Sequence, residues 1–107
     1  MALLGNHLPR KCGIATFTTD LCTPIADEFP ALDCLVVAMN DAGHTHAYPP
    51  MVRFEIEEND VASYRRAVDF LKVSTVDVVS LQHEYGIFGG KAGALILPLL
   101  AELRMPI

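Results

Sequence analysis

The 107-residue sequence has no tryptophan, only three cysteines and no long hydrophobic run. Its cysteines, Cys12, Cys22 and Cys34, are odd in number and form no C-x-x-C pair. This argues against a disulfide framework and a zinc knuckle and favours reduced thiols. The strongest apolar stretch, Ala92 to Ala101, is about half as long as the ~20 residues of a membrane span and contains Pro98. No membrane span is expected.

Positive charge is also scarce. The eight lysines and arginines are outnumbered by thirteen acidic residues, for a formal net charge of −5, and they are scattered along the chain. A nucleic-acid surface needs a basic stripe, so nucleic acid is not an expected partner. Residues 1–11 have too short an apolar core and no small-residue cleavage pattern for a signal peptide. We expect a cytoplasmic protein.

What the sequence does contain is an alternation of strand-like and helix-like periods, the pattern of βα units around a parallel sheet. Residues 2–4, 34–39, 52–56 and 76–81 have the character of strands. The run 34–39 is continuously apolar, as in a strand buried on both faces, whereas 52–56 alternates with charged residues, as at a sheet edge. The expected fold class is α/β, a three-layer Rossmann-like parallel sheet with strand order 3-2-1-4.

Apolar residues at helical spacing predict three helices, over about 14–29, 61–71 and 95–103. Two of them contain proline, which removes a hydrogen bond and crowds the preceding turn. Pro24 should therefore kink or restart the first helix near residue 23. Pro98 requires the third helix to begin late, close to residue 95, or to bend.

The last two residues, Pro106 and Ile107, resemble the start of a further strand. We therefore expect residues 1–107 to be part of a longer protein. The strand that should cover the edge of 76–81 would then be missing from the isolated chain. We expect self-association of this chain, by edge pairing, by strand exchange or through the apolar face near 95–103.

Three segments, in this order, resemble a known family. They are residues 9–18 (Pro-Arg-Lys-Cys-Gly-Ile-Ala-Thr-Phe-Thr), residues 48–56 (Tyr-Pro-Pro-Met-Val-Arg-Phe-Glu-Ile) and residues 77–90 (Asp-Val-Val-Ser-Leu-Gln-His-Glu-Tyr-Gly-Ile-Phe-Gly-Gly). The succession resembles the amino-terminal half-domain of bacterial family 4 (group 1) glycosyltransferases, over nearly the whole chain. The resemblance implies retaining transfer of a sugar from a nucleotide-sugar donor to a hydroxyl acceptor. No cofactor is implied, since the nucleotide sugar is a substrate.

The same resemblance implies a two-domain GT-B fold. Residues 1–107 would be a partial, acceptor-side amino-terminal domain, and a carboxy-terminal Rossmann domain outside this sequence would hold most of the donor. The histidine that the family usually carries at the end of the next strand would lie beyond Ile107. We therefore expect the isolated chain to be inactive.

The loop before the first helix is the expected donor-phosphate site. A glycine at a strand-to-helix turn allows close backbone approach, and the amides at the helix start can point at phosphate. Arg10 and Lys11 add positive charge, and the resemblance places the pyrophosphate near Gly13, beside Cys12. The alternative is that Gly13 only makes the turn and that Arg10 and Lys11 are solvated, because one glycine is a weaker signal than G-x-G-x-x-G.

The expected acceptor site follows the strand that ends at residue 81, where open α/β sheets place ligands. Its candidates are His83, Glu84, Tyr85, Gly89 and Gly90, because imidazole and carboxylate offer directional partners for sugar hydroxyls. The catalytic residue is unassigned, with His83 as the one candidate for proton exchange. Alternatives are that His83 and Glu84 bond loop amides and that Tyr85, Ile87 and Phe88 pack the loop. Residues 89–91 could bind an anion at the next helix start or form a flexible lid.

Other chemistries have less support. No G-x-S-x-G elbow, P-loop or H-E-x-x-H is present. His44 and His46 lie near Asp41, but in a Gly- and Pro-flanked loop without zinc spacing, so no metal is expected. A different class of protein remains open: a non-catalytic flavodoxin-like domain that binds a phosphorylated ligand at the same strand ends, although it lacks the acidic cluster of a phosphoacceptor domain.

Overall fold

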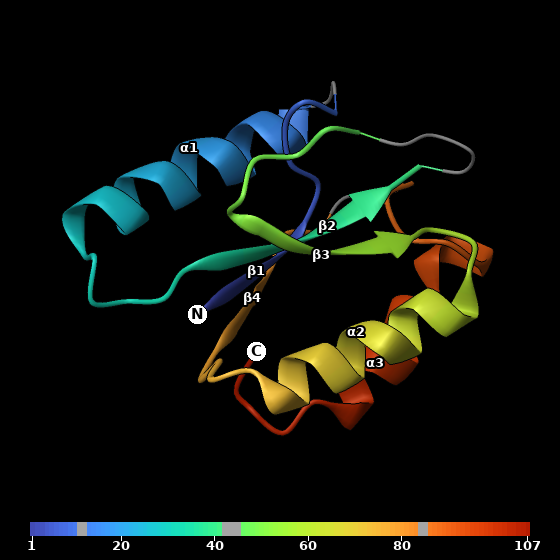
Figure 1. Cartoon of the computed structure of the whole chain (residues 1–107). Coiled ribbons are helices and arrows are strands. Elements are labelled where there is room, and N and C mark those ends of the chain that lie inside the picture. Colours follow the sequence, from blue (N-terminus) through green and yellow to red (C-terminus); the bar gives the residue numbers. More distant parts are fainter. Residues whose placement is uncertain (11–12, 42–45, 84–85) are drawn as a thin grey trace.

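A computed structural model describes residues 1–10, 13–41, 46–83 and 86–107 as a three-layer α/β fold (Figure 1). The elements are, in order, β1 (Ala2–Gly5), α1 (Gly13–Glu28), β2 (Leu35–Asn40), β3 (Val52–Glu57), α2 (Val61–Val73), β4 (Val79–Leu81), the 3-10 helix η1 (Lys91–Gly93) and α3 (Ile96–Glu102). The described strands are all parallel, in the order β3-β2-β1-β4. The fold class and strand order expected from the sequence are confirmed.

The sheet is the central layer, with α1 on one face and with α2 and α3 on the other (Figure 1). Every residue of β2 is buried, as its continuous apolar run predicts. The larger core lies between the sheet and the α2/α3 layer, and the smaller one lies under α1. Representative members are Leu4, Val37, Ile56, Leu71 and Leu99 in the larger core and Leu3, Cys22 and Val36 in the smaller core.

The first helix corrects one expectation. α1 runs from Gly13 to Glu28 as a single helix that contains Pro24, so the helix does not restart near residue 23, and the expected kink there stays a prediction. Leu21 and Ile25, on either side of the proline, both pack against the smaller core. We infer that this shared contact with the sheet offsets the hydrogen bond that proline cannot make.

α2 and α3 begin at residues that favour the start of a helix. Asp60 caps α2, its side-chain oxygen accepting from the amide of Ala62 at 3.0 Å. Three of the four residues expected to form its apolar stripe are buried, and Val61 in the first turn is exposed. α3 begins at Ile96, which puts Pro98 in the first turn, as expected. The amide that proline lacks would have no partner within the helix at this position, so no hydrogen bond is lost.

Among the described helices, none has the length and apolar character needed to cross a bilayer.

β4 is shorter than expected, because only Val79 to Leu81 of the segment 76–81 pair as a strand. Its outer side is partly covered. The amide of Val79 donates to the carbonyl of Pro106 at 2.9 Å, so the last residues lie beside β4. This is the place that the expected further strand would occupy, and self-association through the rest of this edge stays a prediction.

Candidate functional site

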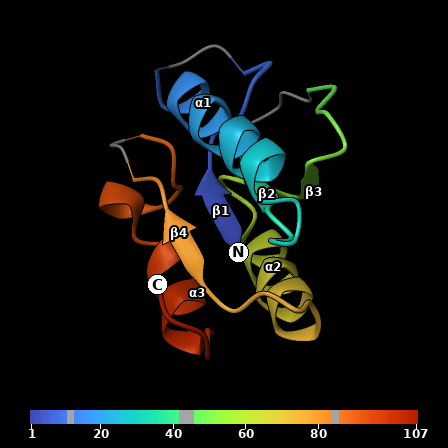
Figure 2. The ribbon, with the colours of Figure 1, turned by 90° about the vertical axis from the view of Figure 1, so that its left-hand side faces the viewer.

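The strand order places a topological switch point between β1 and β4. The chain goes from β1 to β2 and β3 on one side and then returns to β4 on the other side. Ligands of open α/β sheets bind at such a point, outside the carboxyl ends of the strands. The described parts of the two segments that flank it are residues 6–10 after β1, and residues 82–83 and 86–90 after β4 (Figure 2). The structure thus brings the predicted donor and acceptor segments to one edge of the sheet, after neighbouring strands.

The two strand ends touch each other at Gly5. The amide of Gln82 donates to the carbonyl of Leu4 at 2.8 Å. A Cβ on Gly5 would lie 2.8 Å from Cβ of Gln82, closer than real Cβ atoms approach. A glycine is therefore required here for packing, because any side chain would separate the two walls of the switch point.

Gly13 presents the opposite case. It is the exposed first residue of α1, and a Cβ added to it would meet no described atom within 4 Å. Its φ also lies outside the left-handed region that favours glycine. The described structure therefore gives no conformational or packing reason for glycine at this turn. Lys11 and Cys12, the other expected members of the donor loop, lie outside the described residues.

Arg10 is held in place by the protein and is not solvated. Its Nη1 donates to Oδ1 of Asn6 at 3.0 Å and to the carbonyl of Met39 at 2.8 Å, and its Nε lies 3.8 Å from Oδ1 of Asp41. Only 13% of the side chain is exposed. The guanidinium thus links the carboxyl ends of β1 and β2, next to the switch point. A direct contact of Arg10 with phosphate stays a prediction.

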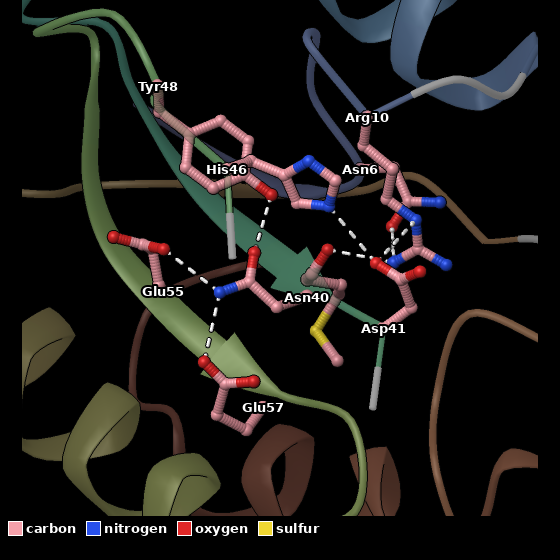
Figure 3. Close-up of polar contacts among 9 residues, drawn as sticks. Asn6, Arg10, Asn40, Asp41, His46, Tyr48, Glu55 and Glu57 are labelled. Atoms are coloured by element: carbon pink, nitrogen blue, oxygen red, sulfur yellow. Dashed lines mark hydrogen bonds and ion pairs between the residues drawn. The ribbon is translucent and has the colours of Figure 1, made fainter. Parts of the chain in front are cut away.

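A polar network that was not expected extends from this point across β2 and β3 (Figure 3). Asn40 is 1% exposed, and its Oδ1 accepts from the hydroxyl of Tyr48 at 2.6 Å. Its Nδ2 donates to Oε1 of Glu55 at 2.9 Å and to Oε1 of Glu57 at 3.0 Å. Burial, with a smaller contribution from the charge of Glu55, raises the pKa of Tyr48 to about 12. The phenol is therefore a neutral hydrogen-bond donor at physiological pH.

An irregular register explains how the two carboxylates reach Asn40. Val36 pairs with Val52 but Val37 pairs with Phe54, so one extra residue is inserted in β3. Val52 packs with the α1-side core, whereas Phe54 and Ile56 pack with the other core. This corrects the expected simple alternation, which put all three on one face. A bulge of this kind redirects side chains, and here it turns Glu55 and Glu57 toward Asn40.

His7 and Thr18 carry buried polar atoms that have no partner among the described residues. His7 is 2% exposed, and its Nδ1 donates to the carbonyl of Leu8 at 2.7 Å. Within the described part of the chain, His7 Nε2 and Thr18 Oγ1 make no hydrogen bond. Each buried polar atom without a hydrogen bond lowers the stability of the fold by about 1–3 kcal/mol, and native proteins contain few such atoms. Both residues belong to the β1–α1 unit that forms the predicted donor wall.

The loop that contains His44 and His46, where no metal is expected, is only partly described. His46 Nε2 lies 3.1 Å from Oδ1 of Asp41, the carboxylate that also approaches Arg10, and His44 lies outside the described residues. In the part of the chain that the structure describes, no group of three or more His, Cys, Asp or Glu residues is arranged to hold a metal ion.

On the acceptor side, the structure describes His83 but not Glu84 and Tyr85. His83 is exposed and its ring stacks on Phe88, with centroids 5.7 Å apart and planes at 28°. Ile87 and Phe88 are buried in the larger core, which confirms the loop packing expected for this apolar pair. The imidazole is thus supported on one face by the loop.

The two glycines of the acceptor segment differ. Gly89 is buried, its amide donates to the hydroxyl of Tyr64 at 3.0 Å, and its carbonyl accepts from the amide of Leu95 at 3.1 Å. A Cβ on Gly89 would collide with the carbonyl of Glu58. Gly90 is exposed, with φ 81°. These contacts make Gly89 a packing residue, which does not fit the lid alternative at this position. Sugar binding by the two glycines stays a prediction.

The chain was also compared with known proteins. No family model, curated protein or solved structure matches it. The functional inference therefore depends on the chemistry of the two walls of the switch point and on the resemblance carried by the sequence.

Proposed function

We propose that the chain is the amino-terminal part of a retaining glycosyltransferase that moves a sugar from a nucleotide-sugar donor to a hydroxyl acceptor. One observation carries this proposal: the loop that ends at Gly13 and the segment that begins at Gln82 follow neighbouring parallel strands at the switch point. A transferase needs donor and acceptor at one place, and this arrangement supplies two adjacent walls for them.

The donor wall is formed by the start of α1. The first turn contains no acidic residue, so the partial positive charge of this 16-residue helix is not neutralised there. A Cβ at position 13 would meet no described atom within 4 Å, so Gly13 keeps the approach to the start of the helix unobstructed. Arg10, fixed by Asn6 and the carbonyl of Met39, is already ordered before binding, and its charge is shared with Asp41, whose Oδ1 lies 3.8 Å from Nε. Lys11 and Cys12 are proposed to complete this wall.

The acceptor wall is formed by the segment after β4. The imidazole of His83 is a hydrogen-bonding group of the kind that recognises a sugar hydroxyl, and Phe88 stacks on the ring. Glu84, Tyr85 and Gly90 are proposed neighbours in this wall. We assign His83 to acceptor binding ahead of proton exchange.

The experiment is a titration of isotope-labelled chain 1–107 with uridine or guanosine diphosphate, followed by amide chemical shifts. Because most donor contacts belong to the proposed second domain, we expect weak binding, with a Kd on the order of 1 mM. The shifts should be concentrated at Gly13 and its helical neighbours, and uridine or guanosine without phosphate should cause none there. The absence of shifts at saturating ligand, or shifts confined to the opposite edge of the sheet, would contradict the proposal.

A second titration, with an alkyl glycoside, tests the acceptor wall. The glycosyltransferase proposal predicts shifts at His83 and at residues 86–91. Diphosphate shifts at Gly13 without any sugar response would favour the non-catalytic phosphate-binding alternative.

A further inference from the structure

A groove of about 460 Å³ lies beside β4, on the α3 side of the sheet. Its described lining residues come from the end of β4 and the segment after it, from η1 and from α3, so the groove starts at the acceptor wall. Figure 2 shows β4 and α3 on the same side of the molecule. We call it the β4–α3 groove. Its lining consists of Leu81, His83, Lys91, Ala92, Gly93, Ala94, Ile96, Leu97 and Leu100.

The groove is predominantly apolar. Leu97 is 61% exposed, and Leu81 and Leu100 are only partly buried. A sugar offers mainly hydroxyl groups and gains little from a wall of leucine side chains. Concave apolar surfaces with a few polar groups are typical of sites for ligands that have an apolar body.

Lys91 carries the only formal charge among the described residues that line the groove. His83 and Lys91 are the only titratable residues among its described lining residues, and no described carboxylate lines it. The chain as a whole carries a formal net charge of −5. A cationic end in an acidic protein is complementary to an anionic group.

The groove is preformed by its backbone. Gly90, Ala92 and Gly93 have φ values of 81°, 52° and 76°, and this left-handed run folds the segment tightly against Leu95 and Phe88. For Ala92 this conformation is strained, because it brings Cβ too close to the following carbonyl oxygen. Because Gly89 is anchored to Tyr64, the wall needs little ordering when a ligand binds, which favours affinity.

We propose that the β4–α3 groove binds an amphiphile, with its apolar body on Leu81, Leu97 and Leu100 and with an anionic group at Lys91 and His83. Its role as the acceptor rests on the proposed function, since His83 belongs to both sites. The acceptor hydroxyl would then be carried by an anionic molecule with an apolar chain rather than by a free sugar.

The experiment titrates chain 1–107 with n-decyl phosphate below its micelle concentration, with n-decyl glucoside and with inorganic phosphate, observed by chemical shifts. Decyl phosphate should bind most tightly and shift the groove residues. Decyl glucoside should bind roughly threefold to fivefold more weakly, as expected for the loss of one exposed ion pair. Inorganic phosphate alone should leave the groove resonances unchanged.

Variants separate the two halves of the groove. Lys91→Gln should weaken decyl phosphate roughly threefold to fivefold and leave decyl glucoside unchanged. Leu97→Ser should weaken both alkyl ligands roughly tenfold, and the exposure of Leu97 makes the change compatible with folding. Arg104→Gln and Val73→Ser, which change an exposed cation and an exposed apolar residue outside the groove, are the matched controls and should have no effect.

Several results would overturn the proposal. They are no binding of decyl phosphate, equal binding of inorganic phosphate, and affinity that neither groove variant changes. Groove shifts that depend on protein concentration without any ligand would show that a second copy of the chain occupies the groove. Nucleoside-diphosphate binding is measured at Gly13, on the other wall, so a failure of the proposed function is recognised separately from a failure of the groove.

Discussion

The hydroxyl of Tyr64 on α2 accepts a hydrogen bond from the amide of Gly89, 3.0 Å away, and donates to the carbonyl of Glu58 at 2.9 Å. One side chain thereby fixes the loop after β4 to the turn between β3 and α2. The loop could not make this contact with a side chain at position 89, because a Cβ there would collide with the same Glu58 carbonyl. Both candidate ligand sites on the β4 side depend on this anchor.

Removal of the Tyr64 hydroxyl should therefore destabilise the fold. Tyr64→Phe leaves the buried Gly89 amide without its acceptor, which should lower the free energy of unfolding by about 1–3 kcal/mol in urea titrations. Gly89→Ala should cost more, about 3 kcal/mol, because the loop must move. Gly86→Ala is the control: its φ of 87° is strained but no described atom is near, so about 1 kcal/mol is expected. Equal losses for the two glycine variants would argue against the anchor.

The phenol of Tyr48 makes stability depend on pH in the alkaline range. Its pKa is about 12 in the folded chain against about 10 for an ordinary tyrosine. The folded state therefore holds this proton more tightly, and the corresponding stability is present below about pH 10 and lost as pH rises toward 12. Unfolding at a series of alkaline pH values should show a steeper loss for the natural chain than for Tyr48→Phe. Parallel pH profiles for the two proteins would contradict the buried network.

Buried thiols should be unreactive. Cys22 and Cys34 lie 3.9 Å apart as free cysteines in the smaller core, and burial, followed by the proximity of Cys34, raises the pKa of Cys22 to about 12. Thiolate is the reactive form, so roughly a thousandfold less of it is present at neutral pH than for an ordinary cysteine. Thiol titration of Cys12→Ser should detect no fast-reacting group in the native chain and two after denaturation. Fast modification of the native variant would show that this core opens.

Local sequence patterns were sufficient for the fold. The continuous run of β2, the charged alternation of β3 and the helical stripe of α2 report burial directly, and parallel order follows from the βα alternation. Two features depend on tertiary packing, which local patterns do not report. Leu21 and Ile25 both pack against the smaller core, and this contact stabilises α1 on either side of Pro24. The extra residue in β3 is defined only by the pairing of β3 with β2.

The candidate site was predicted only in part. His83 was predicted as a site residue because it follows the end of a strand. Asn6 and Asn40 also lie at strand ends, but the sequence offers no further reason to assign them to the site. Tyr48 had no comparable signal, because its hydroxyl reaches Asn40 only after the chain returns through the loop before β3. The groove beside β4 is likewise formed by segments that adjoin only in the folded chain.

The proposed distribution of donor and acceptor binding between two domains can be tested by measuring the activity of the isolated chain. Since the proposed function places most donor contacts and the family histidine outside this sequence, purified chain 1–107 should transfer no sugar from any nucleotide-sugar donor to any acceptor tried. A sensitive assay of released nucleoside diphosphate measures this, with Arg104→Gln as a matched preparation. Turnover by the chain alone that His83→Gln abolishes would overturn the expectation and make His83 the catalytic base.

Gly13→Ala provides the most direct test of the central claim, because the described structure offers a methyl group free space at this position. We predict that the free energy of unfolding stays the same or rises by up to about 1 kcal/mol, as for other glycine-to-alanine changes in compatible helical positions. In the same preparation, nucleoside-diphosphate affinity should fall by roughly tenfold, about 1.4 kcal/mol, because the methyl group blocks approach to the helix amides. Unchanged affinity at unchanged stability would contradict a donor wall at the start of α1.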